Sequence, residues 1–362
     1  MLKSIELRKF PELDSIRFIS IFLVVLHHQF LTQNMFLTWL GSYGWVGVDL
    51  FFVLSGFLIT NLLKAEYKKT NTIQLKNFWL KRMIRLWPSW LFTQAITFPI
   101  VYYFSRNDNV LREILYHKFW HYFLHFGNYS YAYFGKLHTL YGHFWSLAVE
   151  EHFYVLWPIL LLTIFKKPKC ATPVLLTMVF IPYGFRVFHI INNDVYAVIK
   201  LSTHTRFDEL IWGCVLALNF DKLPKLTLWS EFFVTIFMIL LFYTGLQILD
   251  HSKMTPYFSE FNFTLIGIAC CLFIWIAVNG SQKGLRKILQ TSLISKLGIL
   301  SYGVYLIHVL TNTFIYGLIK NFSAGMDQNL IALINFVIPF FPAYLMYMYI
   351  DKKFEVMKKS II

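Results

Sequence analysis

The chain has 362 residues, of which 57% are hydrophobic, 19% aromatic and only 14% charged. Its mean hydropathy is +0.54. Because soluble domains carry about 25% charged residues, this composition excludes a soluble globular protein. The four cysteines predict no disulfide framework, since Cys214, Cys270 and Cys271 lie inside apolar runs. We therefore expect an all-α, polytopic membrane protein.

Ten apolar runs approach or reach the roughly 20 residues that a membrane-spanning helix needs. They predict ten spans, at about 16–34, 45–63, 86–104, 144–165, 172–191, 206–220, 228–249, 261–279, 297–319 and 329–350. The first and sixth also carry ionisable side chains. Polar residues inside spans usually face a protein interior or a water-filled cavity. These two weak spans are where we expect function.

The net charge of +14 would suggest nucleic acid in a soluble protein. Here most basic residues lie in short segments between the apolar runs, so no nucleic-acid partner is expected. With the N-terminus in the cytoplasm, the segments placed inside hold 23 Lys and Arg residues and those placed outside hold 7. The positive-inside rule therefore predicts that both termini are cytoplasmic. We expect one transmembrane domain over residues 1–362, with no appended soluble domain.

Arg17 and His28 are the first candidate pair. Eleven residues at 100° each make three turns plus 20°, so both side chains share one face of the predicted first span, about 16 Å apart along its axis. The alternative is a packed membrane histidine that donates one interhelical hydrogen bond. Spacing alone favours that alternative.

Asp49 lies about one turn inside the second predicted span, in a glycine-containing run from Gly44 to Thr60. A lone carboxylate there needs a partner, which we expect to be Arg or His. The glycines would allow close approach between helices. A structural buried ion pair and a functional carboxylate are equally good interpretations of this residue.

Arg82 and Arg85 are three residues apart, so they share one helical face at the cytoplasmic mouth of the third predicted span. The arginine guanidinium suits phosphate groups. The alternatives are topology determinants or contacts with anionic lipids, and for an arbitrary membrane protein these are favoured.

The strongest single signal is the segment from Trp145 to Tyr154, with adjacent Glu150 and Glu151 in the outer half of the fourth span. Packing alone hardly explains two neighbouring carboxylates there. A carboxylate that orients a histidine is a general-base arrangement, and His28 is predicted at similar depth. This segment favours function.

Two further polar groups lie within predicted spans, and each is equally well explained as a satisfied polar network. Arg206 and Asp208 open the sixth span, and the ninth carries Tyr305 and His308. A third group could bind zinc by its i, i+4, i+8 spacing. It consists of His117, His121 and His125. Because the same stretch is rich in aromatic residues, an interfacial helix is favoured and no metal is expected.

Taken in order, these motifs resemble those of the acyltransferase-3 family of integral membrane acyltransferases. The resemblance runs along nearly the whole chain and rests on five segments: Leu13–Arg17 with His28, Gly47–Phe52 with Ser55–Phe57, Lys81–Pro88, Trp145–Leu147 with Glu150, Glu151, Phe153 and Tyr154, and Ser301–Tyr302 with Tyr305 and His308. Departures are small: His152 stands where glutamine is usual, Ser15 where glycine is common, and His27 where an aromatic residue often precedes the histidine.

The resemblance implies an O-acyltransferase, most often an O-acetyltransferase, of the bacterial cytoplasmic membrane. It implies acyl-CoA as donor, with acetyl-CoA the commonest, and a glycan or other carbohydrate as acceptor. Some members carry an SGNH-type domain in addition, which we do not expect here. Arg17, Arg82 and Arg85 would bind the phosphates of CoA.

The same resemblance points to His28 as the general base, oriented by Glu150 or Glu151. Asp49 would fix a neighbouring Arg or His. Arg206 and Tyr305 are candidates for stabilising the oxyanion, with lesser candidate roles in substrate binding for Trp145, Asp208 and His308. Direct transfer and an acyl-histidine relay both remain open.

The main alternative function is a transporter or flippase of a glycan or lipid-linked sugar, which would more often show internal repeats than this sequence does. The membrane-bound O-acyltransferases also use an intramembrane histidine, but lack this ordered set of motifs. The acceptor cannot be read from the sequence.

Overall fold

The computed structural model describes residues 10–28, 35–135, 138–248, 260–281, 283–322 and 328–361, and residues 29–34 of the first predicted span lie outside these ranges. No strand occurs in these ranges. The α-helices are α1 (Pro11–His27), α2 (Met35–Ser42), α3 (Val46–Thr70), α4 (Leu75–Ser105), α5 (Asn109–Phe123), α6 (Gly127–Phe134), α7 (Trp145–Phe165), α8 (Ala171–Ile191), α9 (Tyr196–Leu201), α10 (Phe207–Asn219), α11 (Leu228–Ile248), α13 (Asn262–Asn279), α14 (Leu285–Leu289), α15 (Ser292–Ile299), α16 (Ser301–Phe322), α17 (Gln328–Val337), α18 (Phe340–Met346) and α19 (Lys352–Ile361). Short 3-10 turns and one π-helix, η5 (Tyr347–Asp351), complete the chain. The all-α class is confirmed.

Six helices in these ranges are long and apolar enough to cross a membrane, or seven if one bent pair forms a single span. They cover Val46–Thr70, Thr139–Phe165, Pro168–Ile191, Leu228–Gln247, Asn262–Asn279 and Asn329–Met357, and the bent pair is Ser292–Ile299 with Ser301–Leu318. The protein is therefore an integral membrane protein. The predicted number of ten spans is not confirmed.

Helices do form at the other three predicted spans. Here α1 has 17 described residues and α10 only 13, both short of a typical span. The 31-residue α4 is long enough, but it begins with basic residues and buries the polar side chains of Thr93, Gln94 and Thr97. Ionisable and polar residues thus separate these helices from the purely apolar ones.

The chain forms two compact units. The first comprises the described parts of Met1–Arg17, Asp49–Leu75 and Val149–Leu297, and the second those of Phe18–Val48, Lys76–Ala148 and Gly298–Ile362. The boundaries fall inside α1, α3, α4, α7 and α15.

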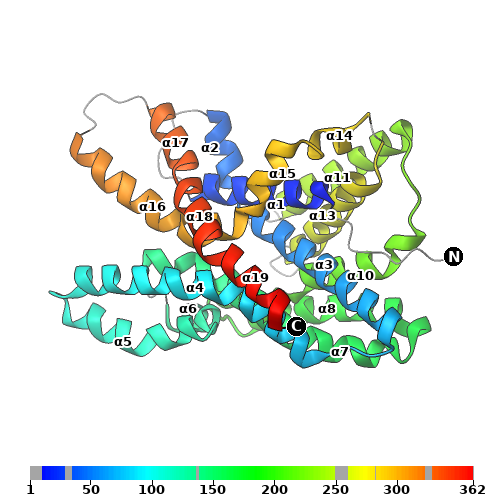
Figure 1. Cartoon of the computed structure of the whole chain (residues 1–362), viewed down its shortest axis with the longest axis horizontal. Helices are drawn as coiled ribbons and strands as arrows, with labels where there is room; N and C mark the ends of the chain where they lie inside the picture. Colours follow the sequence, from blue (N-terminus) through cyan, green and yellow to red (C-terminus); the bar gives the residue numbers. More distant parts are fainter. Residues whose placement is uncertain are drawn as a thin grey trace. The chain divides into compact units, whose positions relative to one another are not determined.

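In the first unit, α10 packs against both α8 and α13, and α11 runs along α13 (Figure 1). Two glycines let α3 and α10 approach closely: a Cβ on Gly56 would lie 2.0 Å from the Leu210 carbonyl oxygen, and one on Gly213 would lie 2.0 Å from that of Val53. Small residues at such crossings are typical of helix pairs in membranes. This close contact brings α10, with its acidic first turn, against α3.

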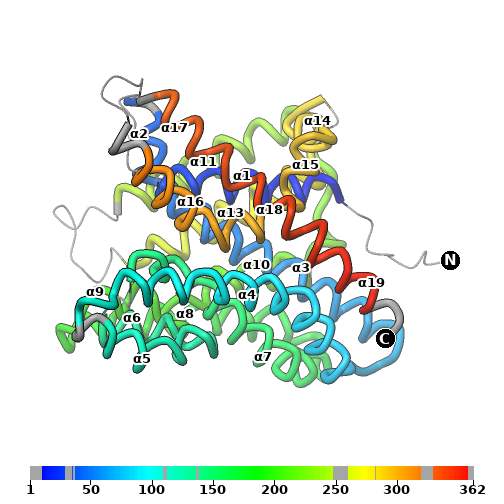
Figure 2. The backbone as a smooth tube through the Cα atoms, turned by 60° about the vertical axis from the view of Figure 1, so that its left-hand side comes forward, coloured from blue at the N-terminus to red at the C-terminus, as the bar shows by residue number. Residues whose placement is uncertain are grey.

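In the second unit, α16 (orange) and α18 (red) pack together (Figure 2). The Tyr302 hydroxyl donates to the Leu86 carbonyl oxygen at 2.9 Å, which ties the start of α16 to α4. Along α16, the six residues from Tyr302 to His308 span about 9 Å. The basic face of α4 and the histidine of α16 are thereby linked through one hydrogen bond.

Candidate active site

His28 follows directly on α1, and its main-chain N–H donates to the carbonyls of Val24 and Val25, so it continues the last helical turn. Its ring Nδ1 lies 2.9 Å from the Val24 carbonyl oxygen. Because a carbonyl oxygen only accepts, Nδ1 must carry the hydrogen. The lone pair of the neutral ring is therefore on Nε2.

His308 is fully buried on α16, and its Nδ1 lies 2.8 Å from the carbonyl oxygen of Tyr305. By the same argument its Nδ1 is protonated and its Nε2 carries the lone pair. That Nε2 lies 3.3 Å from His28 Nδ1. The hydrogen on His28 Nδ1 is thus shared between Val24 and His308, which fixes the His28 ring with Nε2 as its basic atom.

A third imidazole, that of His143, completes this cluster, and our sequence reasoning missed it. Its ring centroid lies 4.9 Å from that of His308 and 6.4 Å from that of His28. The side chain is 4% exposed. One sequence signal could have pointed to His143: it lies two residues before Trp145, the half-buried residue that opens the strongest sequence motif.

Neither ring nitrogen of His143 has a hydrogen-bond partner among the described residues. Main-chain groups of Tyr305 and Leu306 lie near the ring without meeting hydrogen-bond geometry. Leaving a buried polar group unpaired costs about 1–3 kcal/mol. The unpartnered His143 ring, in a cluster of imidazoles, therefore requires a physical explanation.

Tyr305 holds the segment that carries His143. Its hydroxyl donates to the His143 carbonyl oxygen at 2.7 Å and lies 2.6 Å from Ser146 Oγ. Since the Tyr305 proton is used on the carbonyl, the Ser146 hydroxyl must be the donor in the second contact. Tyr305 therefore joins α16 to the 3-10 turn η1 (Thr139–Phe144) and to the first turn of α7.

The first unit contains a buried ionic cluster around Arg206. Its guanidinium donates hydrogen bonds to the carboxylates of Asp49 and Glu209, and the distance from Nε to the Glu209 oxygen is 2.9 Å. It also donates to the Lys200 carbonyl oxygen at 3.0 Å. Asp49 and Glu209 are both fully buried. Asp49 therefore has a partner of the type expected.

Asp208, two residues from Arg206, points elsewhere and pairs with Arg186 of α8. The two Arg186 terminal nitrogens lie 3.1 and 2.8 Å from its carboxylate oxygens, and both side chains are fully buried. Thr264 of α13 also donates to Asp208 at 3.2 Å. This bidentate pair joins α8, α10 and α13, which makes a structural role the simplest interpretation of Asp208.

Glu150 lies in the first unit with two hydroxyl donors. Ser55 Oγ donates to one carboxylate oxygen at 2.7 Å, and the Tyr154 hydroxyl donates to the other at 3.2 Å. The neighbouring Glu151 is half-buried, and His152 Nδ1 lies 2.6 Å from the Thr203 hydroxyl. Thr203 belongs to the turn that leads into Arg206, so this part of α7 also supports the ionic cluster.

The three arginines expected to bind phosphate are all at least partly exposed. Arg17 lies 2.5 Å from Asp14, one turn earlier on α1. On α4, Arg82 is half-buried beside the ring of Phe78, and Arg85 is exposed. Guanidinium groups in such positions can reach a ligand that is partly in solvent.

The histidines of the suspected zinc face do not share one helix face. His117 lies on α5, 3.9 Å from Glu113, and α5 ends at Phe123. His125 has a positive φ of 61° and its ring lies against Trp90, with centroids 4.7 Å apart. A backbone in this left-handed region no longer continues the helix, which removes the i, i+8 relationship.

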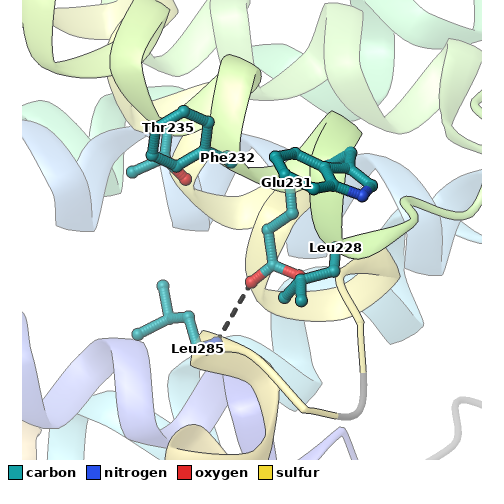
Figure 3. Close-up of a pocket in the computed structure, with 6 residues that line it drawn as sticks. Leu228, Glu231, Phe232, Thr235 and Leu285 are labelled. Atoms are coloured by element: carbon teal, nitrogen blue, oxygen red, sulfur yellow. Dashed lines mark hydrogen bonds between the residues drawn. The ribbon is translucent and has the colours of Figure 1, made fainter.

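A groove of about 440 Å³ lies at the start of α11 in the first unit, lined by α11 side chains and by Leu285 of α14 (Figure 3). Its one ionisable side chain is Glu231. The two carboxylate oxygens of Glu231 accept main-chain N–H groups of Ser281 at 2.6 Å and of Leu285 at 3.1 Å, the second bond being drawn in Figure 3. Because this carboxylate anchors a loop, the groove offers no reacting group.

The sequence profile of the acyltransferase domain, acyltransferase-3 type, matches residues 10–350. The peptidoglycan O-acetyltransferase OatA of Listeria monocytogenes is 30% identical over 321 residues, which cover 82% of this chain and 48% of that protein. The O-acetyltransferase OatA of Staphylococcus aureus (strain NCTC 8325) is 30% identical over 321 residues, which cover 83% of this chain and 50% of that protein.

The chain thus spans about half the length of the curated relatives it matches. No solved structure matches it significantly.

Proposed function

Because the chain belongs to the acyltransferase-3 family of integral membrane proteins, we propose that it transfers an acyl group from acyl-CoA to a carbohydrate hydroxyl, with His28 as general base. Acetyl is the proposed acyl group, since both OatA relatives are named O-acetyltransferases. A glycan of the bacterial cell envelope is the proposed acceptor, because the Listeria relative is named for peptidoglycan. The bacterial cytoplasmic membrane is the proposed location.

The hydrogen bonding of the His28 ring carries this proposal. A general base needs a lone pair at a fixed position, within about 3 Å of the proton that it removes. Val24 and His308 hold Nδ1 in its protonated form, so Nε2 has the lone pair. When Nε2 takes a proton, the Nδ1 hydrogen bond to the His308 lone pair strengthens, because the donor is now charged.

The proposed reaction is a direct transfer. His28 Nε2 takes the hydroxyl proton as the acceptor oxygen bonds to the thioester carbon, and the carbonyl becomes an oxyanion. The carbonyl then re-forms as the carbon–sulfur bond breaks, and the proton on His28 moves to the sulfur, giving free CoA. An acyl-histidine relay remains the alternative sequence of steps.

The basic face of α4 supports the assignment of CoA as donor. Arg82 and Arg85 are accessible and three residues apart, which suits the phosphate groups of CoA. Arg85 directly precedes Leu86, whose carbonyl oxygen accepts the hydrogen bond from the Tyr302 hydroxyl. His308 lies about 9 Å beyond Tyr302 along the axis of α16. That distance is short enough for a flexible pantetheine arm. Arg17 is a third proposed phosphate contact.

In this proposal the ionic cluster around Arg206 is structural. Its guanidinium bonds to two carboxylates and a carbonyl, and it is 3% exposed. Asp49 then fixes Arg206 rather than exchanging protons with substrate. Glu150 accepts hydrogen bonds from Ser55 and Tyr154, which fix the orientation of its carboxylate within the first unit.

The experiment uses purified protein in detergent with radiolabelled acetyl-CoA, measuring CoA release and label transfer. Wild type is compared with His28→Ala, Arg85→Ala and His27→Ala, the last as control because His27 is exposed and its Nδ1 bonds to the Gly41 carbonyl. We expect His28→Ala to lose about 10²–10⁴-fold in rate. Arg85→Ala should raise KM for acetyl-CoA, and His27→Ala should resemble wild type.

Full activity in His28→Ala would sink the histidine mechanism. If wild type neither binds nor turns over acyl-CoA, the transporter function becomes the one to test.

A further inference from the structure

We propose that His143 is a further catalytic residue, whose ring N–H donates a hydrogen bond to the thioester carbonyl oxygen as that atom becomes an oxyanion. This inference rests on the proposed function and adds to it the group that stabilises the developing negative charge. Preorganised donors aimed at such an atom are commonly the largest single contribution to catalysis of acyl transfer.

The first argument is the unused hydrogen-bonding capacity of the His143 ring. A neutral imidazole has one N–H donor whichever nitrogen carries the hydrogen. In His143 neither nitrogen has a partner among the described residues, and the side chain is 4% exposed. Buried polar atoms normally have partners, so an unpartnered ring here points to a bound group as its partner.

The second argument is the spacing of the three rings. The His143 and His28 centroids are 6.4 Å apart, with the rings inclined at 68°. A reacting centre must lie about 3 Å from both the base and the oxyanion donor. Two rings at this separation can flank a thioester carbonyl, with the attacked hydroxyl on the His28 side and the carbonyl oxygen on the His143 side.

The third argument concerns Tyr305, the oxyanion candidate from the sequence. Its hydroxyl hydrogen is donated to the His143 carbonyl oxygen at 2.7 Å, and its oxygen accepts from Ser146. Stabilising an oxyanion would require Tyr305 to give up that bond. The geometry favours His143 as the donor and Tyr305 as the residue that positions it.

Packing holds the His143 ring in place. The Phe144 ring lies against it with centroids 4.0 Å apart, and Phe144 in turn packs edge-on against Trp90 of α4 at 4.8 Å. Both aromatic side chains are buried. A donor held this way needs little reorganisation during the reaction, which is the condition for effective oxyanion stabilisation.

The proposed step balances without any further reactant. As the acceptor oxygen forms its bond to the carbonyl carbon, the C=O π pair moves onto oxygen, and the His143 N–H donates to it without transferring the proton. The pair returns when the carbon–sulfur bond breaks. The only proton that moves is the one that His28 takes from the hydroxyl and delivers to sulfur.

The test compares His143→Ala, which removes the donor, with His143→Gln, which restores an N–H at similar reach. His125→Ala is the matched control, because it also removes a buried imidazole, one that packs against Trp90. The measurements are kcat and KM for acetyl-CoA transfer by the full-length protein in detergent, with thermal unfolding to check folding.

We expect His143→Ala to lower kcat by about 10²–10³-fold, with KM for acetyl-CoA within about twofold of wild type. His143→Gln should recover at least about tenfold of that loss. His125→Ala should lower thermal stability while leaving kcat close to wild type.

The inference is overturned if folded His143→Ala keeps kcat within about threefold of wild type, or if Gln recovers none of the loss. It is also overturned if KM rises while kcat stays unchanged, since His143 would then only bind substrate. Failure of the proposed function looks different: wild type would transfer no acyl group, or His28→Ala would remain fully active.

Discussion

His308 Nε2 lies 3.3 Å from His28 Nδ1, which joins two imidazoles 280 residues apart in the sequence. The end of α1 and the middle of α16 therefore meet at one shared hydrogen. Each Nδ1 also faces a carbonyl oxygen of its own helix, Val24 for His28 and Tyr305 for His308. Together these contacts set the tautomer of both rings, because carbonyl oxygens accept and never donate.

The first prediction concerns His308. His308→Phe removes the acceptor for the His28 Nδ1 hydrogen, and a hydrogen bond to a charged ring contributes about 1.5–3 kcal/mol. We expect kcat to fall about 10–100-fold, since 1.4 kcal/mol corresponds to tenfold in rate. His308→Gln, which can present a carbonyl oxygen, should lose less. Equal activity of wild type and a folded His308→Phe would show that His28 does not depend on this contact.

The second prediction concerns the crossing of α3 and α10. Gly56→Ala and Gly213→Ala each place a Cβ 2.0 Å from a main-chain carbonyl oxygen of the other helix. The helices must separate, and we expect a loss of about 1–3 kcal/mol, as for other overpacked sites. Thermal unfolding in detergent measures it.

Gly184→Ala is the control, because its Cβ would meet nothing within 4 Å on α8. Alanine is favoured over glycine by about 0.5–1 kcal/mol inside a helix, so this variant should be as stable as wild type or more so. Destabilisation of all three variants to the same extent would contradict the close approach.

The third prediction concerns the buried pair of Arg186 and Asp208. Arg186→Met leaves the Asp208 carboxylate buried without its bidentate partner, which costs about 3–5 kcal/mol. Arg186→Met combined with Asp208→Leu removes both charges and should regain most of that loss. A double-mutant cycle of unfolding free energies measures the coupling, and near-additive effects would show that the pair contributes little.

The fourth prediction is a pH dependence. A hydrogen bond from Lys64 holds the pKa of Asp221 below its usual value; the Lys64 Nζ to carboxylate distance is 2.9 Å. A lowered folded-state pKa means that the unfolded chain binds the proton more readily. The stabilisation is therefore fully present above the unfolded Asp pKa of about 3.9 and is lost as the pH falls through the lower folded pKa.

We expect the melting temperature of Asp221→Asn to fall less steeply than that of wild type below about pH 4. Lys64→Met should flatten the acid side of the profile in the same way, and the double variant should add nothing further. Parallel acid profiles for wild type and Asp221→Asn would rule out this ion pair as a source of acid sensitivity.

The fold class could be predicted from composition because long apolar runs have few alternatives to membrane-spanning helices. The number of spans was harder. In α1, α4 and α10 polar and ionisable residues shorten or interrupt the apolar stretch, so these three helices are not among those of the described residues that are long and apolar enough to count as spans, and the number of ten is not confirmed. Before α10, for example, a 3-10 turn over Thr203–Thr205 leads into Arg206, and the α-helix begins only at Phe207.

Pairings between distant residues were the least predictable feature of the site. The partner type of Asp49 followed from the cost of an isolated charge, and Arg206 is of that type. The choice between Arg206 and Arg186 for Asp208 did not follow, because only the packing of α8 against α10 brings Arg186 to the Asp208 carboxylate. Roles of the candidate residues in catalysis remain predictions.

The sequence by itself determined an all-α integral membrane protein of the acyltransferase-3 family, because composition and ordered motifs are properties of the linear chain. Only the tertiary structure decided which groups surround His28. His143 lies one residue before the fourth predicted span, and its ring meets His28 and His308 only when η1 and α16 pack together through Tyr305. The tautomer of His28, and hence its basic atom, depends on which acceptors lie within hydrogen-bond distance of Nδ1. Spacing along a sequence does not contain that information.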